Sequence, residues 1–167
     1  MKTRSLLSSL VAVLVLSAAP AGADTWEVHG NRCQPDTNDA VKFDLSNTGL
    51  FNVNSSSSGK LHCPIEYISD LHPIDFNTTK LQVKYVDRSS TSDVTCTLYI
   101  NLFDGSPLLT ETKTSPAGAS DTTQTFEWSI GTQIGGGRQL EIQCTIPKAA
   151  SSSTRSGVRG IRLDTNV

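Results

Sequence analysis

The chain has 167 residues and a formal net charge of −2, and 18% of its residues are charged. This length suits one ordinary domain with a sizeable core. A slightly acidic balance of this kind gives no electrostatic reason to expect nucleic-acid binding.

The first 23 residues have the three-part pattern of a cleavable signal peptide. Lys2 and Arg4 form a short basic region, residues 6–16 form an apolar stretch, and Ala21-Gly22-Ala23 matches the small-residue cleavage site. The apolar stretch is about half of the roughly 20 residues that a membrane-spanning helix needs. We therefore predict cleavage before Asp24, general secretory export to a periplasm or the exterior, and no membrane attachment afterwards.

The predicted mature chain, residues 24–167, is expected to form a single domain. It keeps 12 basic and 16 acidic residues, because the leader removes two basic ones. Basic residues are concentrated near its C-terminus, and we favour a solvated basic strip over an anion-binding face there. The strip contains Arg138, Lys148, Arg155, Arg159 and Arg162, against Glu141 and Asp164.

Four cysteines, an even number in an exported chain, predict two disulfides. Their spacings of 30, 33 and 48 residues contain no C-x-x-C pair, which argues against a zinc site. Sequence leaves three pairings open. Three of the cysteines share parity with apolar residues of predicted strands, so we prefer a loop-to-strand bridge and a strand-to-strand bridge: Cys33–Cys63 and Cys96–Cys144.

The apolar residues of the mature chain alternate with polar ones, which is the period of half-buried strands. We expect about eight short strands in an all-β antiparallel sandwich. A jelly-roll-like topology is preferred to an immunoglobulin-like one. The clearest runs are 81–85, 94–100, 126–130, 140–146 and 161–163, with further candidates at 25–29, 41–43, 50–53 and 61–65. Arg159, just before the run 161–163, has the parity of Ile161 and Leu163, so a bulge at Gly160 is expected to turn it outward.

The densest polar cluster is the segment from Asp70 to Asp75, which includes His72. Its carboxylates and imidazole can serve as an acid/base pair or as metal ligands, although Asp and His are also common turn formers. No H-E-x-x-H pair or G-x-S-x-G serine is present in the chain.

Exposed aromatic rings provide another route to function, since sugar-binding sandwiches stack such rings on pyranose faces. Trp128 shares its face with apolar neighbours and is expected in the core. Tyr99 is out of parity with its apolar neighbours, Tyr67 follows a predicted strand, and Trp26 lies near the mature N-terminus. These three rings are the predicted glycan contacts.

No cofactor is predicted. Calcium is the ion that best suits an exported sandwich, because hard oxygens from loops suffice to bind it. The available carboxylates form no recognisable binding loop in the sequence; they are Asp70, Asp75, Asp87, Asp93, Asp104 and Asp121.

Short motifs run through the mature chain in a recognisable order. They are Cys33-Gln34-Pro35, the run 49–55, Cys63-Pro64-Ile65, Cys96-Thr97-Leu98, Cys144-Thr145-Ile146-Pro147 and the run 156–162. This order resembles a group of uncharacterised secreted bacterial proteins with Cys-Pro, Cys-x-Leu and Cys-x-x-Pro strand elements. The resemblance implies a bacterial source and a disulfide-bonded sandwich, and it implies no activity.

The function that these observations favour is a noncatalytic, secreted surface or binding module whose partner is a glycan or another cell-surface component. One alternative is a small secreted hydrolase with its site near Asp70, His72 and Asp75. Another is a purely structural envelope protein. The oligomeric state and the ligand are not set by the sequence.

Overall fold

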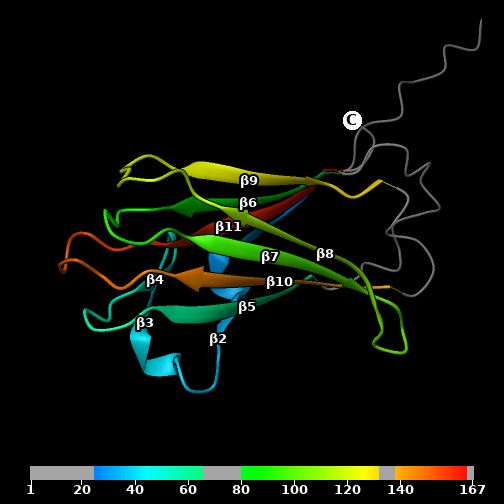
Figure 1. Cartoon of the computed structure of the whole chain (residues 1–167), viewed down its shortest axis with the longest axis horizontal. Helices are drawn as coiled ribbons and strands as arrows, with labels where there is room; N and C mark the ends of the chain where they lie inside the picture. The colour runs from blue at the N-terminus through cyan, green and yellow to red at the C-terminus, as the bar shows by residue number, and fades with distance from the viewer. Residues whose placement is uncertain (1–24, 66–79, 132–137, 165–167) are drawn as a thin grey trace, which may run out of the picture.

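The computed structural model describes residues 25–65, 80–131 and 138–164, which fold into two antiparallel sheets packed face to face (Figure 1). Sheet A has the strand order β3-β4-β11-β6-β9, with β1 also paired to β11. Its strands are β1 (Thr25–His29), β3 (Phe43–Ser46), β4 (Gly49–Asn52), β6 (Lys80–Val86), β9 (Gln124–Ser129) and β11 (Gly157–Asp164).

Sheet B has the order β2-β5-β10-β7-β8. Two short 3₁₀ helices, η1 and η2, flank β2 in the chain. The remaining elements are η1 (Gly30–Arg32), β2 (Gln34–Pro35), η2 (Ala40–Lys42), β5 (Gly59–Ile65), β7 (Thr95–Asn101), β8 (Pro107–Thr114) and β10 (Gln139–Ile146).

The order of the strands along the chain gives the sandwich its jelly-roll character. From β4 to β11 each connection crosses from one sheet to the other, except the hairpin that joins β7 to β8. The expected all-β antiparallel sandwich is therefore confirmed. The number of strands is eleven among the described residues, more than the eight expected, because β2 is very short and β8 has no apolar stripe to reveal it.

The core lies between the sheets and is made by the inward residues of the alternating strands. Trp128 is 1% exposed, which confirms its predicted place in the core. Its neighbour Phe126 stacks on Tyr85 with ring centroids 4.1 Å apart. Burial of each such aromatic contributes about 1.5–3 kcal/mol.

The predicted bulge in the last strand is confirmed. The register between β11 and β6 shifts between Val158 and Gly160, so Arg159 is the extra residue. Val158 is buried and Arg159 is half-buried, with its Nη1 donating to Thr123 Oγ1 at 2.9 Å. One predicted strand start was wrong: residues 40–42 form η2, and the strand begins at Phe43.

The sandwich has two distinct ends. Residues 87–94 and 147–156 connect strands at the left end in Figure 1, whereas β10 begins and β11 finishes at the other end. No helix in the described part of the chain is long and apolar enough to cross a membrane.

Candidate functional site on the outer face of sheet B

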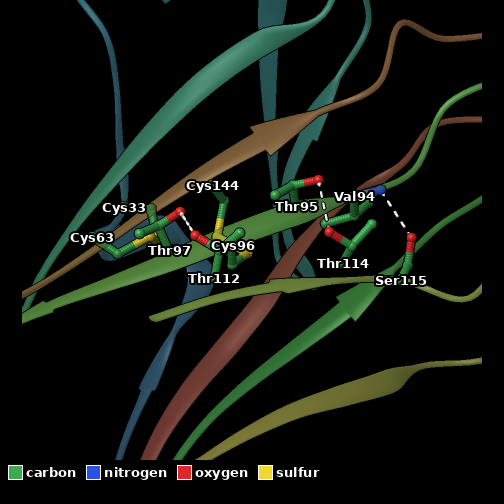
Figure 2. The surroundings of a disulfide bond; sticks show 10 residues. All are labelled: Cys33, Cys63, Val94, Thr95, Cys96, Thr97, Thr112, Thr114, Ser115 and Cys144. Carbon is green, nitrogen blue, oxygen red and sulfur yellow. Dashed lines mark hydrogen bonds between the residues drawn. A yellow bond between two sulfur atoms is a disulfide. The ribbon is translucent and has the colours of Figure 1, made fainter. Parts of the chain in front are cut away.

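The outer face of sheet B is rich in hydroxyl groups. Thr97 stands opposite Thr112 with their Oγ1 atoms 2.9 Å apart, and Thr95 stands opposite Thr114 at 3.5 Å (Figure 2). The pleat places these side chains outward because the residues between them point into the core. Cross-strand threonine pairs of this kind contribute about 0.2–1 kcal/mol each.

Disulfides fix the strands beneath this face. Cys96 of β7 lies directly opposite Cys144 of β10, and the two are bonded under the threonine pairs (Figure 2). Cys33, just after η1, is bonded to Cys63 of β5. Both preferred pairings are confirmed, and all four cysteines are bonded.

A polar cluster spans β5 and β10 on the same face. His62 donates from Nδ1 to Glu141 Oε1 at 2.7 Å, and its Nε2 lies 3.4 Å from Gln143 Nε2. Asp36, which follows β2, places Oδ2 3.9 Å from the same Nε2. The histidine ring is therefore held between two carboxylates and an amide, with its side chain 36% exposed.

Tyr99 is the aromatic member of the face. It lies on β7 directly opposite Glu141 on one side and Thr110 on the other. Its outward direction is confirmed, although it is half-buried rather than fully exposed. The ring and the Glu141 carboxylate thus belong to neighbouring strands in the same cross-strand row, which continues to Pro64.

A hollow of about 310 Å³ lies at the end of the face where β10 begins. Glu141 belongs both to the hollow and to the His62 cluster, so the two are continuous. The hollow is lined by Pro64, Ile65, Asn101, Arg138, Gln139, Leu140 and Glu141.

The β7–β8 hairpin extends beyond the hollow from Asn101. Its turn is closed by backbone bonds from Leu102 to Ser106 and from Gly105 to Leu102. Asp104 accepts from the hydroxyl and the backbone N–H of Ser106, and these bonds hold the pKa of Asp104 below its usual range. This turn presents Phe103 with 82% of its surface exposed.

The loop that carries Asp36 is anchored by Asp39. Its carboxylate pairs with Lys42 Nζ at 2.7 Å and accepts from the backbone N–H of Lys60 at 2.7 Å. The Lys42 contact is the larger cause and the Lys60 bond the second, and together they lower the pKa of Asp39. This anchor holds the loop against the start of β5, the strand that carries His62.

The outer face of sheet A differs in character because ion pairs cover it. Glu27 pairs with Lys84 at 2.7 Å, which lowers the pKa of Glu27. Glu127 accepts from Gln82 and pairs with Lys80 at 3.1 Å, and both contacts lower its pKa. Sheet B, with its threonine hydroxyls, an aromatic ring and a histidine cluster that contains one amide and two carboxylates, is the better candidate surface for an uncharged ligand.

The sequence-predicted site residues are described to different extents. Tyr67, Asp70, His72 and Asp75 lie outside the described residues. Trp26 lies in β1 opposite Leu163, and its side chain is not among those described. Tyr99 is thus the one predicted contact whose side chain the structure places, and it does lie on the candidate face.

Sequence reasoning missed His62, Glu141, Gln143 and Asn101 as members of one site. Their outward direction was available from the alternation of β5, β7 and β10. Which of these residues are neighbours could not be predicted, because strand order and register decide which outward residues meet.

Across residues 25–65, 80–131 and 138–164, no three His, Cys, Asp or Glu side chains gather closely enough to hold a metal ion. Asp87, a potential calcium ligand, is 1% exposed and has protein donors on both oxygens. Oδ1 accepts from Ser89 N and Ser156 Oγ, and Oδ2 accepts from Val94 N and Ser115 Oγ.

No protein-family model matches the chain, and no curated protein matches it. A xylan-binding module, CBM15, has a similar solved structure, with a TM-score of 0.50 and 12% identity over 86% of this chain and 97% of that one. At this identity the likeness shows the fold alone: a β-sandwich shared with a carbohydrate-binding module.

Two further solved structures are more distant. One contains the CBM22-1 and GH10 modules of xylanase 10B from Clostridium thermocellum, with a TM-score of 0.44 and 16% identity over 87% of this chain and 28% of that one. The other is from infectious bursal disease virus, with a TM-score of 0.43 and 12% identity over 99% of this chain and 36% of that one. This chain therefore spans about a third of each of those proteins.

Proposed function

We propose that the outer face of sheet B binds a neutral glycan. The observation that carries the proposal is the row formed by Tyr99 and Glu141, which opens into the 310 Å³ hollow. A sugar ring has an apolar face and an edge of hydroxyls, so an aromatic ring beside fixed polar groups matches both.

The polar groups around Tyr99 supply the edge contacts. Glu141 accepts hydrogen bonds, whereas the amides of Gln143, Gln139 and Asn101 both donate and accept. Three of these four residues line the hollow, and Gln143 contacts His62 beside it. Phe103, exposed on the neighbouring hairpin, provides a second ring near the same end.

Charge favours a neutral ligand over a polyanion on this face. Asp36 and Glu141 lie on either side of His62, so an anionic chain would meet two carboxylates at the centre of the cluster. The Cys96–Cys144 disulfide holds β7 and β10 in fixed relation, and Cys33–Cys63 ties the segment after η1 to β5. This rigidity reduces the ordering cost of binding.

The arrangement supports binding better than catalysis. The cysteines under the face are bonded to one another, and two pairs of its threonine hydroxyls are within 3.5 Å of each other. The hydrolase alternative rests on Asp70, His72 and Asp75, which lie outside the described residues, and it stays a prediction. Comparing the wild type with His72→Ala and Asp75→Ala variants on ester, glycoside and peptide substrates would test it.

Two disulfides favour folding in an oxidising compartment, and the proposed leader over residues 1–23 would bring the chain there. Mass spectrometry of the exported product tests this, since cleavage before Asp24 fixes its mass. A product that retains residues 1–23 would contradict it.

The glycan proposal is tested with a panel of neutral polysaccharides. Xylan comes first because the module of similar fold is named as xylan-binding, followed by mixed-linkage glucan, galactan and dextran. Affinity gel electrophoresis with and without calcium should show retardation by at least one of them. Unchanged mobility with all four would refute the proposal and favour a purely structural envelope protein.

A further inference from the structure

A second pocket, of about 290 Å³, lies on sheet A at the end where β10 turns into β11. This is the end of the sandwich opposite the hollow on sheet B (Figure 1). Three arginines line it: Arg88, Arg155 and Arg159. The rest of the lining is four Ser and Thr hydroxyl side chains together with Asp44 and Phe51.

The local sequence explains why the arginines converge. Arg155 and Arg159 stand two residues on either side of Gly157, which pairs with Phe51 of β4 and with Val86 of β6. A Cβ on Gly157 would lie 2.7 Å from Phe51 Cδ1, so glycine is what lets the ring lie against β11. The bulge at Arg159 then gives that side chain its outward direction.

The positive charge of the pocket exceeds its negative charge. Arg155 Nη1 pairs with Asp44 Oδ2 at 3.1 Å. Arg159 has no carboxylate within ion-pair distance in the described part of the chain, and its bond there is to the Thr123 hydroxyl. Three lining arginines against one lining aspartate leave two positive charges.

Arg88 is partly compensated from outside the lining. Its Nε lies 2.8 Å from Asp121 Oδ1, and its Nη1 donates to the carbonyl of Ser153. The Asp121 side chain is 87% exposed, so solvent screens this pair. The guanidinium therefore still contributes to the field of the pocket.

Arginine N–H groups without acceptors give an independent indication that the pocket binds an anion. The Nε atoms of Arg155 and Arg159 are shielded from solvent and have no acceptor among the described residues. A buried N–H without an acceptor costs free energy, and an anion recovers this cost only when the arginine side chains turn to bring these atoms into the pocket. Guanidinium groups also match the paired oxygens of phosphate and sulfate better than a point charge does.

We propose that this pocket binds a tetrahedral oxyanion, phosphate or sulfate, either free or as a monoester on a sugar. The excess of positive charge in the lining favours an anion over a neutral ligand. The hydroxyls of the pocket provide further donors, and the site is separate from the glycan face. The proposed site includes two residues of the basic strip noted in the sequence, Arg155 and Arg159.

The test is calorimetry at constant ionic strength with four probes: inorganic phosphate, inorganic sulfate, glucose 6-phosphate and glucose 6-sulfate. Chloride and glucose serve as blanks. Saturable binding of one anion per chain is expected for at least one probe. Binding of the esters would identify a sugar-borne anion, and binding of the inorganic ions alone would identify a free one. Blank-like heats for all four probes would overturn the proposal.

Two charge-removing variants test whether the anion binds in this pocket. Arg159→Gln should weaken binding about tenfold or more, because charge-assisted bonds are lost. Lys148→Gln removes the same charge from the exposed neighbouring loop and should change affinity less than about twofold, as screened surface charges do. An equal loss in both variants would mean diffuse attraction and would refute the site.

A variant expected to bind more tightly tests the site independently of whether Arg159→Gln folds. Asp44 is the carboxylate that competes with the anion, and its side chain is 61% exposed. Asp44→Asn should therefore tighten binding about threefold or more, since a nearby like charge is removed. Weaker binding by a folded Asp44→Asn protein would contradict the charge argument. Glycan binding by sheet B should be unchanged in every one of these variants.

Discussion

His62 and Glu141 lie on neighbouring strands of sheet B, and the histidine Nδ1 is 2.7 Å from the glutamate Oε1. Both side chains are more than a third exposed, so the pair is open to ligand and to water. A contact of this kind orients groups for binding more than it stabilises the fold.

Glu141→Gln should therefore separate binding from stability. The free energy of unfolding should change by less than about 1 kcal/mol, because exposed pairs contribute little. Affinity for the panel glycan should fall about tenfold, because a charge-assisted acceptor is lost. Urea unfolding and calorimetry measure the two quantities. A large stability loss with unchanged affinity would assign Glu141 a structural role.

Asp87→Asn is expected to destabilise the fold by about 3 kcal/mol, because a buried carboxylate with four donors loses half of its acceptor capacity. The amide NH₂ would face at least one donor, either a backbone N–H or a serine hydroxyl. Asp121→Asn is the control, since that side chain is exposed and should change stability by less than about 1 kcal/mol. Equal urea midpoints for the two variants would contradict this role.

Asp39→Asn should make the free energy of unfolding less dependent on pH. The folded pKa of Asp39 lies below its ordinary value of 3.8, so its stabilisation is present above that pH and is lost as the pH falls through the lowered value. At pH 7 the variant should be less stable by about 1 kcal/mol, the usual contribution of such hydrogen bonds. Urea unfolding from pH 7 downward should show this difference narrowing below pH 3.8. A constant difference would contradict the argument.

Removal of the Cys96–Cys144 bridge by a double alanine substitution should cost about 4 kcal/mol, given the 48-residue separation. The bridge lies under the threonine pairs, so glycan affinity should fall as well. The Cys33–Cys63 double variant is the comparison, and its bridge joins the residue after η1 to β5, the strand next to the edge strand β2. Full retention of urea stability and affinity without Cys96–Cys144 would refute a supporting role.

The fold was largely predictable where apolar residues alternate. β10 was expected over 140–146 and runs over Gln139–Ile146, because every second residue is buried. β8 was missed because its alternation is between threonines and charged residues at a sheet edge, with no apolar stripe. Edge position is a property of the whole sheet, so local periodicity cannot reveal it.

The site was predictable only in part. The parity of Tyr99 correctly indicated an outward ring, and the cost of burying Arg159 correctly indicated a bulge. The convergence of Glu141 with Tyr99 and His62 follows from strand order in sheet B, since β10 lies between β7 and β5. That order is set by long-range packing and leaves no mark on any one segment.

The role of sheet B in glycan binding is tested by the dissociation constants of wild type and Tyr99→Ala for a soluble oligosaccharide of the polysaccharide that the panel identifies. The Tyr99→Ala variant should bind about thirtyfold more weakly, as loss of an anchoring aromatic costs about 2 kcal/mol. Thr125→Ala, an exposed position on β9 of sheet A, should bind like the wild type. Equal affinity of Tyr99→Ala and wild type would contradict the claim that sheet B is the glycan-binding face.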